Sequence, residues 1–198
     1  MTVEISDTRI KIDPSFVGLI CLMMIFCQQK TVAVSVICSV LHECGHLGVM
    51  CMYGDVPEKI TVSAFGMRID RRYGNHSYKK EAIVCMGGIA VNIFVAAIFF
   101  CIYFYCGVIT AAEIAFINIF IAAVNMMPVG ILDFASALRC ILYMKCDVKK
   151  VNIISDGISL AFLIMFIIMS IVYCVFIRVN ISLVAVTVYL VTSYKKRS

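Results

Sequence analysis

Long apolar runs separated by short polar segments dominate the pattern of hydrophobic and polar positions along the chain. A helix of about 20 apolar residues spans the hydrocarbon core of a bilayer. Six runs approach that length, although the first and the last are short. We therefore predict an all-α polytopic membrane protein with about six transmembrane helices, at Ser15–Cys27, Val32–Tyr53, Ala82–Val108, Ala111–Met127, Ile153–Ile177 and Ile181–Tyr194.

Alternation of apolar and polar residues occupies two shorter stretches. Lys59–Asp70 alternates until Phe65 and Gly66 shift the phase, which indicates a strand with a bulge or turn at Gly66. Arg9–Asp13 also alternates, and it stops at Pro14 just before the first predicted span. We predict that these two stretches form a small β element on the cytoplasmic side of the membrane.

Composition supports the membrane assignment. The chain is 63% hydrophobic with a mean hydropathy of +1.01, whereas soluble domains are typically about 45–50% apolar. Charged residues precede the first apolar run and no convincing small-residue cleavage site follows it, so we expect no cleavable secretory signal. Little length remains for a separate soluble domain, and we expect residues 1–198 to form a single domain.

The basic residues predict the orientation of the chain. With the N-terminus in the cytoplasm, six spans place all 17 lysines and arginines inside except Lys30 and Arg178. This distribution follows the positive-inside rule. We therefore predict that both termini are cytoplasmic. The net charge of +5 reflects membrane orientation, and we infer no binding of nucleic acid from it.

The sequence His-Glu-Cys-Gly-His, residues 42 to 46, lies within the apolar run Thr31–Tyr53. Two histidines four residues apart lie about 40° apart around a helix, so His42 and His46 can face one point. Glu43 lies beside them, as in the His-Glu-x-x-His arrangement of zinc proteases. Ionisable residues inside a bilayer usually mark a functional site. The alternative is a pair of structural histidines that satisfy each other inside a helix bundle.

Cysteines contribute little to this picture. None of the 11 forms a C-x-x-C pair, and we interpret them as small packing residues. Cys44 lies inside the metal motif, but two residues after His42 it points about 160° away. We therefore do not count Cys44 as a ligand.

A hydrolytic zinc site needs three protein ligands and one open position. The remaining histidine, His76, lies in a basic loop and is interpreted as a solvated residue. Asp133 is the better candidate, because it follows a predicted span in apolar surroundings and Pro128 breaks the preceding helix. The alternative is that Asp133 caps a helix over residues 134–144. The second and fourth spans run in the same direction, so the three side chains can meet.

Together these motifs resemble those of the site-2 proteases, a family of intramembrane zinc metalloproteases. The resemblance rests on H-E-C-G-H at 42–46 and N-M-M-P-V-G-I-L-D at 125–133, with Gly87-Gly88 and Asn92 similar to a further family motif. The opening I-K-I-D-P-S-F and the strand I-T-V-S-A-F-G-M are similar to the branch that contains stage IV sporulation protein FB. Phe134 departs from the family pattern, which has glycine after the aspartate. No PDZ or CBS domain is expected.

The resemblance implies that His42, His46 and Asp133 hold Zn²⁺, and that Glu43 is the catalytic general base and then the general acid. Asn125 is our candidate for orienting the substrate or the oxyanion. Asn92 is a second candidate, and its alternative is an interhelical hydrogen bond. Two further residues are assigned a structural role at the site, Pro128 and Gly88.

The implied substrate is a membrane protein or membrane-associated peptide in the lipid bilayer, such as a transcription-factor precursor, an anti-sigma factor or a signal-peptide remnant. The strand over residues 60–70 could bind an unwound substrate by β-augmentation. Regulatory membrane partners are also compatible with the family. Two other functions are alternatives. One is a metal or proton transporter, although Glu113 and Asp156 are too few to form a continuous polar path through the membrane. The other is a non-proteolytic membrane scaffold.

Overall fold

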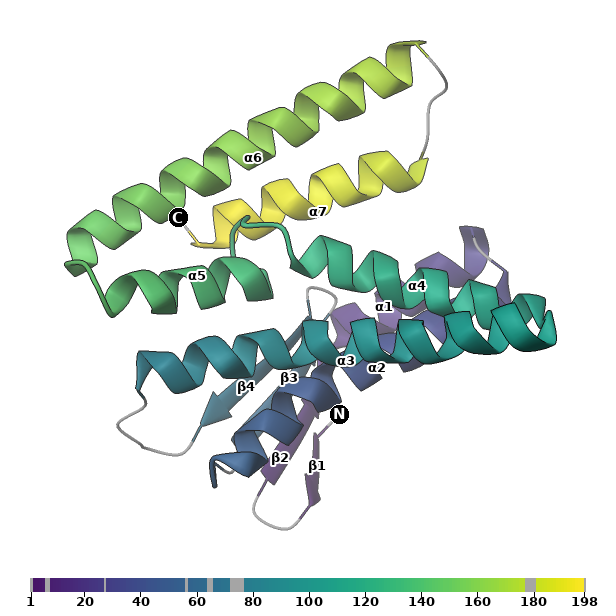
Figure 1. The fold of residues 1–198 in the computed structure, drawn as a ribbon, viewed down its shortest axis with the longest axis horizontal. Coiled ribbons are helices and arrows are strands. Elements are labelled where there is room, and N and C mark those ends of the chain that lie inside the picture. Colours follow the sequence, from purple (N-terminus) through teal and green to yellow (C-terminus); the bar gives the residue numbers. More distant parts are fainter. Residues whose placement is uncertain are drawn as a thin grey trace.

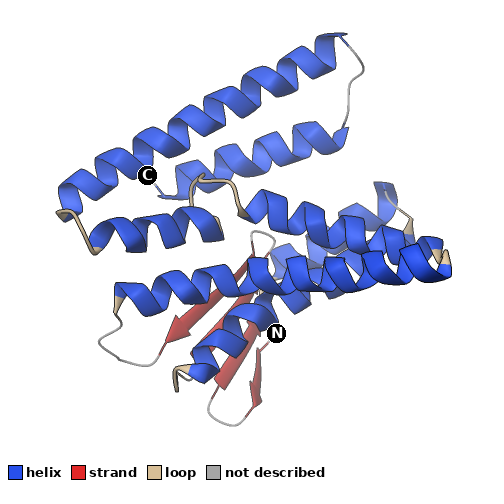
Figure 2. Ribbon diagram, viewed as in Figure 1, coloured by secondary structure: helices blue, strands red, loops and turns tan. Residues whose placement is uncertain are grey.

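The computed structural model describes residues 2–5, 8–26, 28–55, 57–63, 66–71, 77–176 and 181–197. These residues form seven helices and one small sheet. The helices are blue and the strands red in Figure 2. The strands are β1 (Thr2–Ile5), β2 (Thr8–Ile12), β3 (Pro57–Ser63) and β4 (Gly66–Arg71). The helices are α1 (Pro14–Phe26), α2 (Gln29–Met52), α3 (Tyr78–Cys106), α4 (Ile109–Asn125), α5 (Asp133–Tyr143), α6 (Val148–Phe176) and α7 (Ile181–Arg197).

The six predicted spans correspond to α1, α2, α3, α4, α6 and α7, so the predicted fold class is confirmed. Within the described residues, α2, α3 and α6 are each long and apolar enough to cross a membrane, and the other three are shorter apolar helices. The helices extend beyond some predicted ends because polar turns such as Tyr78–Glu81 continue the helix outside its apolar stretch. This pattern indicates an integral, multi-pass membrane protein.

Local capping explains two of the helix ends. Asp13 precedes α1, and its Oδ1 accepts a hydrogen bond from the Ser15 N–H at 3.0 Å, which lowers the pKa of this exposed carboxyl. Pro14 occupies the first helical position, where its missing N–H has no partner to lose. Gly107 ends α3 with a φ of 67°, a conformation that favours glycine, and its N–H donates to the Tyr103 carbonyl.

The sheet has the strand order β1-β2-β3-β4. β2 and β3 are parallel, with Ile10 opposite Ile60, so the two predicted stretches do pair with each other. β1 adds an antiparallel strand that the sequence pattern did not predict. Residues 59–63 lie in β3 and residues 66–70 in β4, and the two strands pair antiparallel, with β4 beginning at Gly66, where the sequence predicts a bulge or turn. β3 is therefore an interior strand, and β4 is an edge strand of the described sheet.

Helices α2, α3 and α4 form the central packing unit. Figure 1 shows the strands on one side of α3 and the helices α5, α6 and α7 on the other. A Cβ added to Gly45 of α2 would lie 2.6 Å from the Gly87 carbonyl oxygen of α3, so glycine lets the two backbones approach closely. Lys30 and Glu113, near the N-terminal ends of α2 and α4, form an exposed ion pair at 3.4 Å. Further along both helices, Asn118 of α4 contacts Cys38 of α2, so the two helices run in the same direction, as the site prediction requires.

Candidate metal centre

His42 and His46 lie on the buried face of α2, with exposed fractions of 4% and 8%. Their Nε2 atoms are 3.3 Å apart, so the two rings converge on one point as the four-residue spacing predicts. Cys44, between them, is exposed on the opposite side of the helix, in agreement with its exclusion from the ligand set. A helix fixes the spacing of these two side chains before any third residue arrives.

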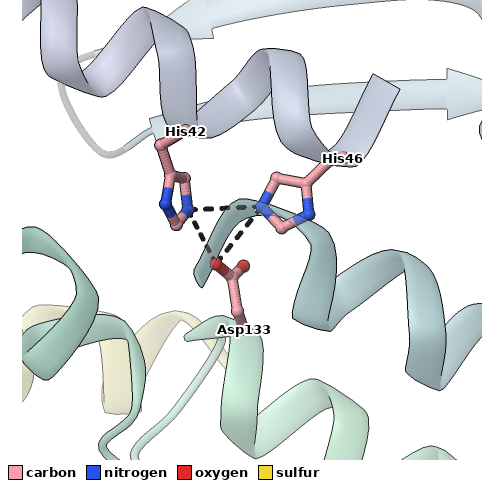
Figure 3. Close-up of side chains that lie close together, drawn as sticks. All are labelled: His42, His46 and Asp133. Carbon is pink, nitrogen blue, oxygen red and sulfur yellow. Dashed lines mark hydrogen bonds and ion pairs between the residues drawn. The ribbon is translucent and has the colours of Figure 1, made fainter. Parts of the chain in front are cut away.

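Asp133 reaches the histidines from a different part of the chain. Its Oδ2 lies 2.8 Å from His42 Nε2 and 3.2 Å from His46 Nε2. Figure 3 shows the three side chains pointing toward one another, with the carboxylate below the two rings. The helix of the alternative interpretation exists as α5, but its N-cap residue is Leu132 and has no side-chain capping bond. The Asp133 carboxylate is turned to the histidines instead.

Side chains of α5 and α6 hold the loop that precedes Asp133. The Pro128 carbonyl accepts a hydrogen bond from Ser159 Oγ of α6 at 2.8 Å. The Gly130 carbonyl accepts one from Arg139 Nη2 of α5 at 3.1 Å. Gly130 has a φ of 61°, and a Cβ there would lie 2.7 Å from the Ser193 backbone of α7. The position of Asp133 is therefore fixed by contacts that α5, α6 and α7 make with the loop.

The hydrogen bonding of His46 is compatible with a cation among the three side chains. Its Nδ1 lies 2.7 Å from the Val84 carbonyl oxygen, an acceptor that requires a proton on Nδ1. In the neutral ring, Nε2 then carries a lone pair, and it faces the anionic Asp133. A cation between them turns this repulsion into attraction. Tetrahedral zinc with bonds of about 2.0–2.1 Å has ligands about 3.3–3.4 Å apart, close to the observed separations of 2.8, 3.2 and 3.3 Å.

Gly88 of α3 keeps the space beside the two rings free. A Cβ added to it would lie 2.5 Å from His46 Nε2 and 2.6 Å from His42 Nε2. These are the atoms that would bind the metal, so any larger side chain would occupy the position of the ligands or of the ion. The three converging donors and this glycine are consistent with a zinc site.

The remaining candidates differ in burial and in hydrogen bonding. Glu43 is half-buried, and its carboxylate acts electrostatically on the His46 ring. Asn125 is half-buried at the end of α4, and its Nδ2 donates to the Ile121 carbonyl at 3.1 Å. Asn92 is fully buried, and neither polar atom of its amide has a partner among the described residues. The interhelical hydrogen bond considered for Asn92 is therefore not seen there. His76 lies outside the described residues.

Three participants were not singled out from the sequence. Val84 contributes a backbone carbonyl, which no side-chain pattern reveals. Ser159 lies on α6, 26 residues beyond Asp133 in the chain, so only the fold brings it to Pro128. Arg139 did leave a signal, because it is a lone cation six residues after Asp133 in a largely apolar helix.

Comparison with known proteins places the fold. No family model matches the sequence, and no curated protein matches it significantly. Among solved structures, the chain is similar to a site-2 protease from Methanocaldococcus jannaschii, with a TM-score of 0.72 and 19% sequence identity. The match covers 100% of this chain and 94% of the other. The chain therefore has the fold of a site-2 protease over its whole length, and the His42, His46 and Asp133 cluster lies within that fold.

Proposed function

We propose that this protein is an intramembrane zinc metalloprotease that hydrolyses a peptide bond in or near a transmembrane segment of its substrate. The observation that carries the proposal is the convergence of His42 Nε2, His46 Nε2 and Asp133 Oδ2. Two of these side chains are buried and the third is largely so, in a helical membrane protein with the fold of a site-2 protease. Charged and polar groups at such a position are costly and are kept for a function.

His42, His46 and Asp133 would hold the zinc. When bound, zinc supplies a Lewis acid that polarises a carbonyl and brings the pKa of a water close to neutrality. Glu43 accepts the proton of the attacking water and then delivers it to the leaving amine. Glu43 lies on the same turn of α2 as His42. Burial strengthens these electrostatic interactions because bulk water is excluded.

Asn125 is proposed to orient the substrate or the oxyanion. Its amide now donates to the carbonyl of its own helix, one turn back. Release of that bond would free the donor to turn toward the scissile carbonyl. The full burial of Asn92 makes it the weaker candidate for the same role, because a substrate would have to part α3 from its neighbours to reach it.

The proposed substrate is a membrane-embedded or membrane-associated polypeptide. A transcription-factor precursor or anti-sigma factor fits the resemblance, and a role in sporulation rests only on the branch-like opening and strand. We also propose that the N- and C-termini lie in the cytoplasm, because this orientation places almost all lysines and arginines inside.

A substrate helix must unwind before its backbone can be cut. β4 is an edge strand of the described sheet, so its outer side could supply the hydrogen bonds that an unwound substrate loses. Two separate variants, Arg68→Pro and Ile69→Pro, test this. Consecutive residues of a strand direct their N–H groups to opposite edges, so only one of the two prolines removes a donor from the outer edge. We expect the substitution on the outer edge to reduce cleavage while leaving zinc binding intact. Equal cleavage by both variants and the wild type would exclude β4 as the substrate strand.

The decisive experiment compares purified wild type with Glu43→Gln in detergent, using a panel of single-span substrates and a zinc determination for both. Glutamine preserves the size of the side chain but cannot act as the base. We expect zinc in both proteins and cleavage only by the wild type. Cleavage by Glu43→Gln at the wild-type rate would contradict the assigned role of Glu43, and a wild type free of zinc would contradict the proposed function.

A further inference from the structure

Three fully buried polar or sulfur-bearing side chains lie next to the metal cluster, on the three central helices. Cys38 of α2 is 2% exposed, and Asn92 of α3 and Asn118 of α4 are both 0% exposed. None of the three is a ligand in the proposed zinc site. Burial of two amides inside a bundle of apolar helices requires an explanation, because buried polar groups are almost always hydrogen-bonded.

The packing of α2 against α3 places Asn92 close to Cys38. A Cβ at Gly45 would meet both Gly87 and Val91, and one at Gly87 would meet both Gly45 and Val49. The two helices therefore run antiparallel. Gly88 contacts His42 across this interface. Four residues later on α3 and four residues earlier on α2, Asn92 lies opposite Cys38, about one helical turn from the metal cluster.

Asn118 reaches the same level from α4. Its Nδ2 donates to Cys38 Sγ at 3.1 Å and to the Ile114 carbonyl at 2.9 Å. Both protons of the amide nitrogen are thereby used, but its Oδ1 has no partner among the described residues. Three helices thus direct polar side chains to one level of the bundle, beside His42.

Unpartnered polar atoms are concentrated at this level. Within the described part of the chain, five buried side-chain atoms have no hydrogen-bond partner, and four of them belong to His42, Asn92 and Asn118. They are His42 Nδ1, both polar atoms of Asn92, and Asn118 Oδ1. Donors and acceptors are both present among them. A water molecule needs two to four such partners to occupy a buried site, and this level supplies them.

The His42 ring has a particular need for an acceptor here. Its Nε2 is directed at Asp133 and His46, so a neutral metal-binding ring must carry its proton on Nδ1. Figure 3 shows that this second nitrogen points away from His46. His46 has the Val84 carbonyl as the acceptor for its own Nδ1–H, whereas His42 has no protein acceptor among the described residues. Metal-binding histidines normally donate their second N–H to a carbonyl, a carboxylate or a water.

We propose that Cys38, Asn92 and Asn118 enclose an ordered-water site that accepts the Nδ1–H hydrogen bond of His42 and orients this ring for metal binding. The water accepts from His42, and it donates to the unpartnered amide oxygens of Asn92 and Asn118. Asn92 and Asn118 are accordingly positioning residues, which act on the metal through His42. The inference rests on the proposed zinc site. It gives His42 an acceptor for its Nδ1–H, as the Val84 carbonyl is for His46.

Matched alanine and serine substitutions test the water site. Serine and alanine are nearly equal in size, but only serine can hold a water. We expect Asn92→Ala and Asn118→Ala to bind zinc about 10- to 100-fold more weakly in competition with a chelator, the range usual for lost second-layer partners. We expect Asn92→Ser and Asn118→Ser to stay close to the wild type. Ser170→Ala removes a buried hydroxyl that bonds Thr187 between α6 and α7, and serves as the control for general damage.

Several results would overturn the water site. Equal zinc affinity of the alanine and serine variants is one of them. Loss of cleavage by Asn92→Ala at unchanged zinc affinity is another, because it would assign Asn92 to the substrate. A wild type that binds no zinc would contradict the proposed function, and a second measurement then tests the water site by itself. In ¹⁵N-histidine-labelled wild type, we expect a protonated Nδ1 on His42 with a cross-peak to water, and an unprotonated Nδ1 would overturn the proposal.

Discussion

The two histidines and the aspartate of the metal centre are held in different ways. His42 and His46 sit on one helix, and close backbone contact between α2 and α3 holds that helix in place. Asp133 follows a loop whose position depends on Ser159 of α6 and Arg139 of α5. One half of the site is therefore set by local helix geometry, and the other half by tertiary contacts. Damage to each half should therefore have different consequences.

Filling the space beside the histidines should have the largest effect. In Gly88→Ala, the new Cβ would lie 2.5–2.6 Å from both Nε2 atoms, far inside normal contact distance. We expect loss of bound zinc and of cleavage, measured on the purified protein, without loss of the helical circular dichroism signal. Gly157→Ala on α6 is the control, because nothing lies within 4 Å of its added Cβ. Normal zinc content in Gly88→Ala would refute the assignment of this space to the metal centre.

Separating α2 from α3 should act on the stability of the histidine half. A Cβ at Gly45 would lie 2.6 Å from a backbone oxygen of α3, and overpacking of this kind costs about 1–3 kcal/mol. Gly48 lies on the same helix with nothing within 4 Å of its added Cβ. We expect Gly45→Ala to lower the free energy of unfolding in a denaturant titration and Gly48→Ala not to lower it. Equal effects of the two would show that close packing of α2 on α3 is not important.

Cutting one loop contact should have the smallest effect, confined to the aspartate half. Ser159→Ala removes the hydrogen bond to the Pro128 carbonyl, which contributes about 1 kcal/mol. We expect a modest loss of zinc affinity, because Asp133 is displaced while the histidine pair is unchanged. Ser170→Ala removes a similar buried hydroxyl away from this loop and should leave zinc affinity unchanged. Equal zinc affinities of Ser159→Ala and the wild type would mean that α6 does not position Asp133.

The same contrast explains what the sequence could predict. Six apolar helices follow directly from run length, and His42 and His46 follow from a four-residue spacing that only a helix can satisfy. The strand character of β2 and β3 follows from alternation in two separate stretches. Each of these inferences needs only local pattern, and the structure agrees with each.

The remaining features depend on contacts between distant parts of the chain. The sequence could not decide between metal binding and helix capping for Asp133, because both follow from a carboxylate just before an apolar helix. The choice is made by the contacts of the loop that precedes α5. Val84 acts through its carbonyl oxygen and carries no side-chain signal. β1 is too short and too polar to stand out before its pairing with β2 is known.

X-ray absorption at the zinc edge of the purified wild type tests the central claim most directly. The chain offers many cysteines as competing ligands. The zinc–sulfur bond is longer than the zinc–nitrogen and zinc–oxygen bonds, so the measured distance distinguishes them. A site made by His42, His46 and Asp133 predicts only nitrogen and oxygen neighbours at about 2.0–2.2 Å, with the outer-shell pattern of two imidazoles. A shell that contains sulfur at about 2.3 Å, or protein that binds no zinc, would contradict the account.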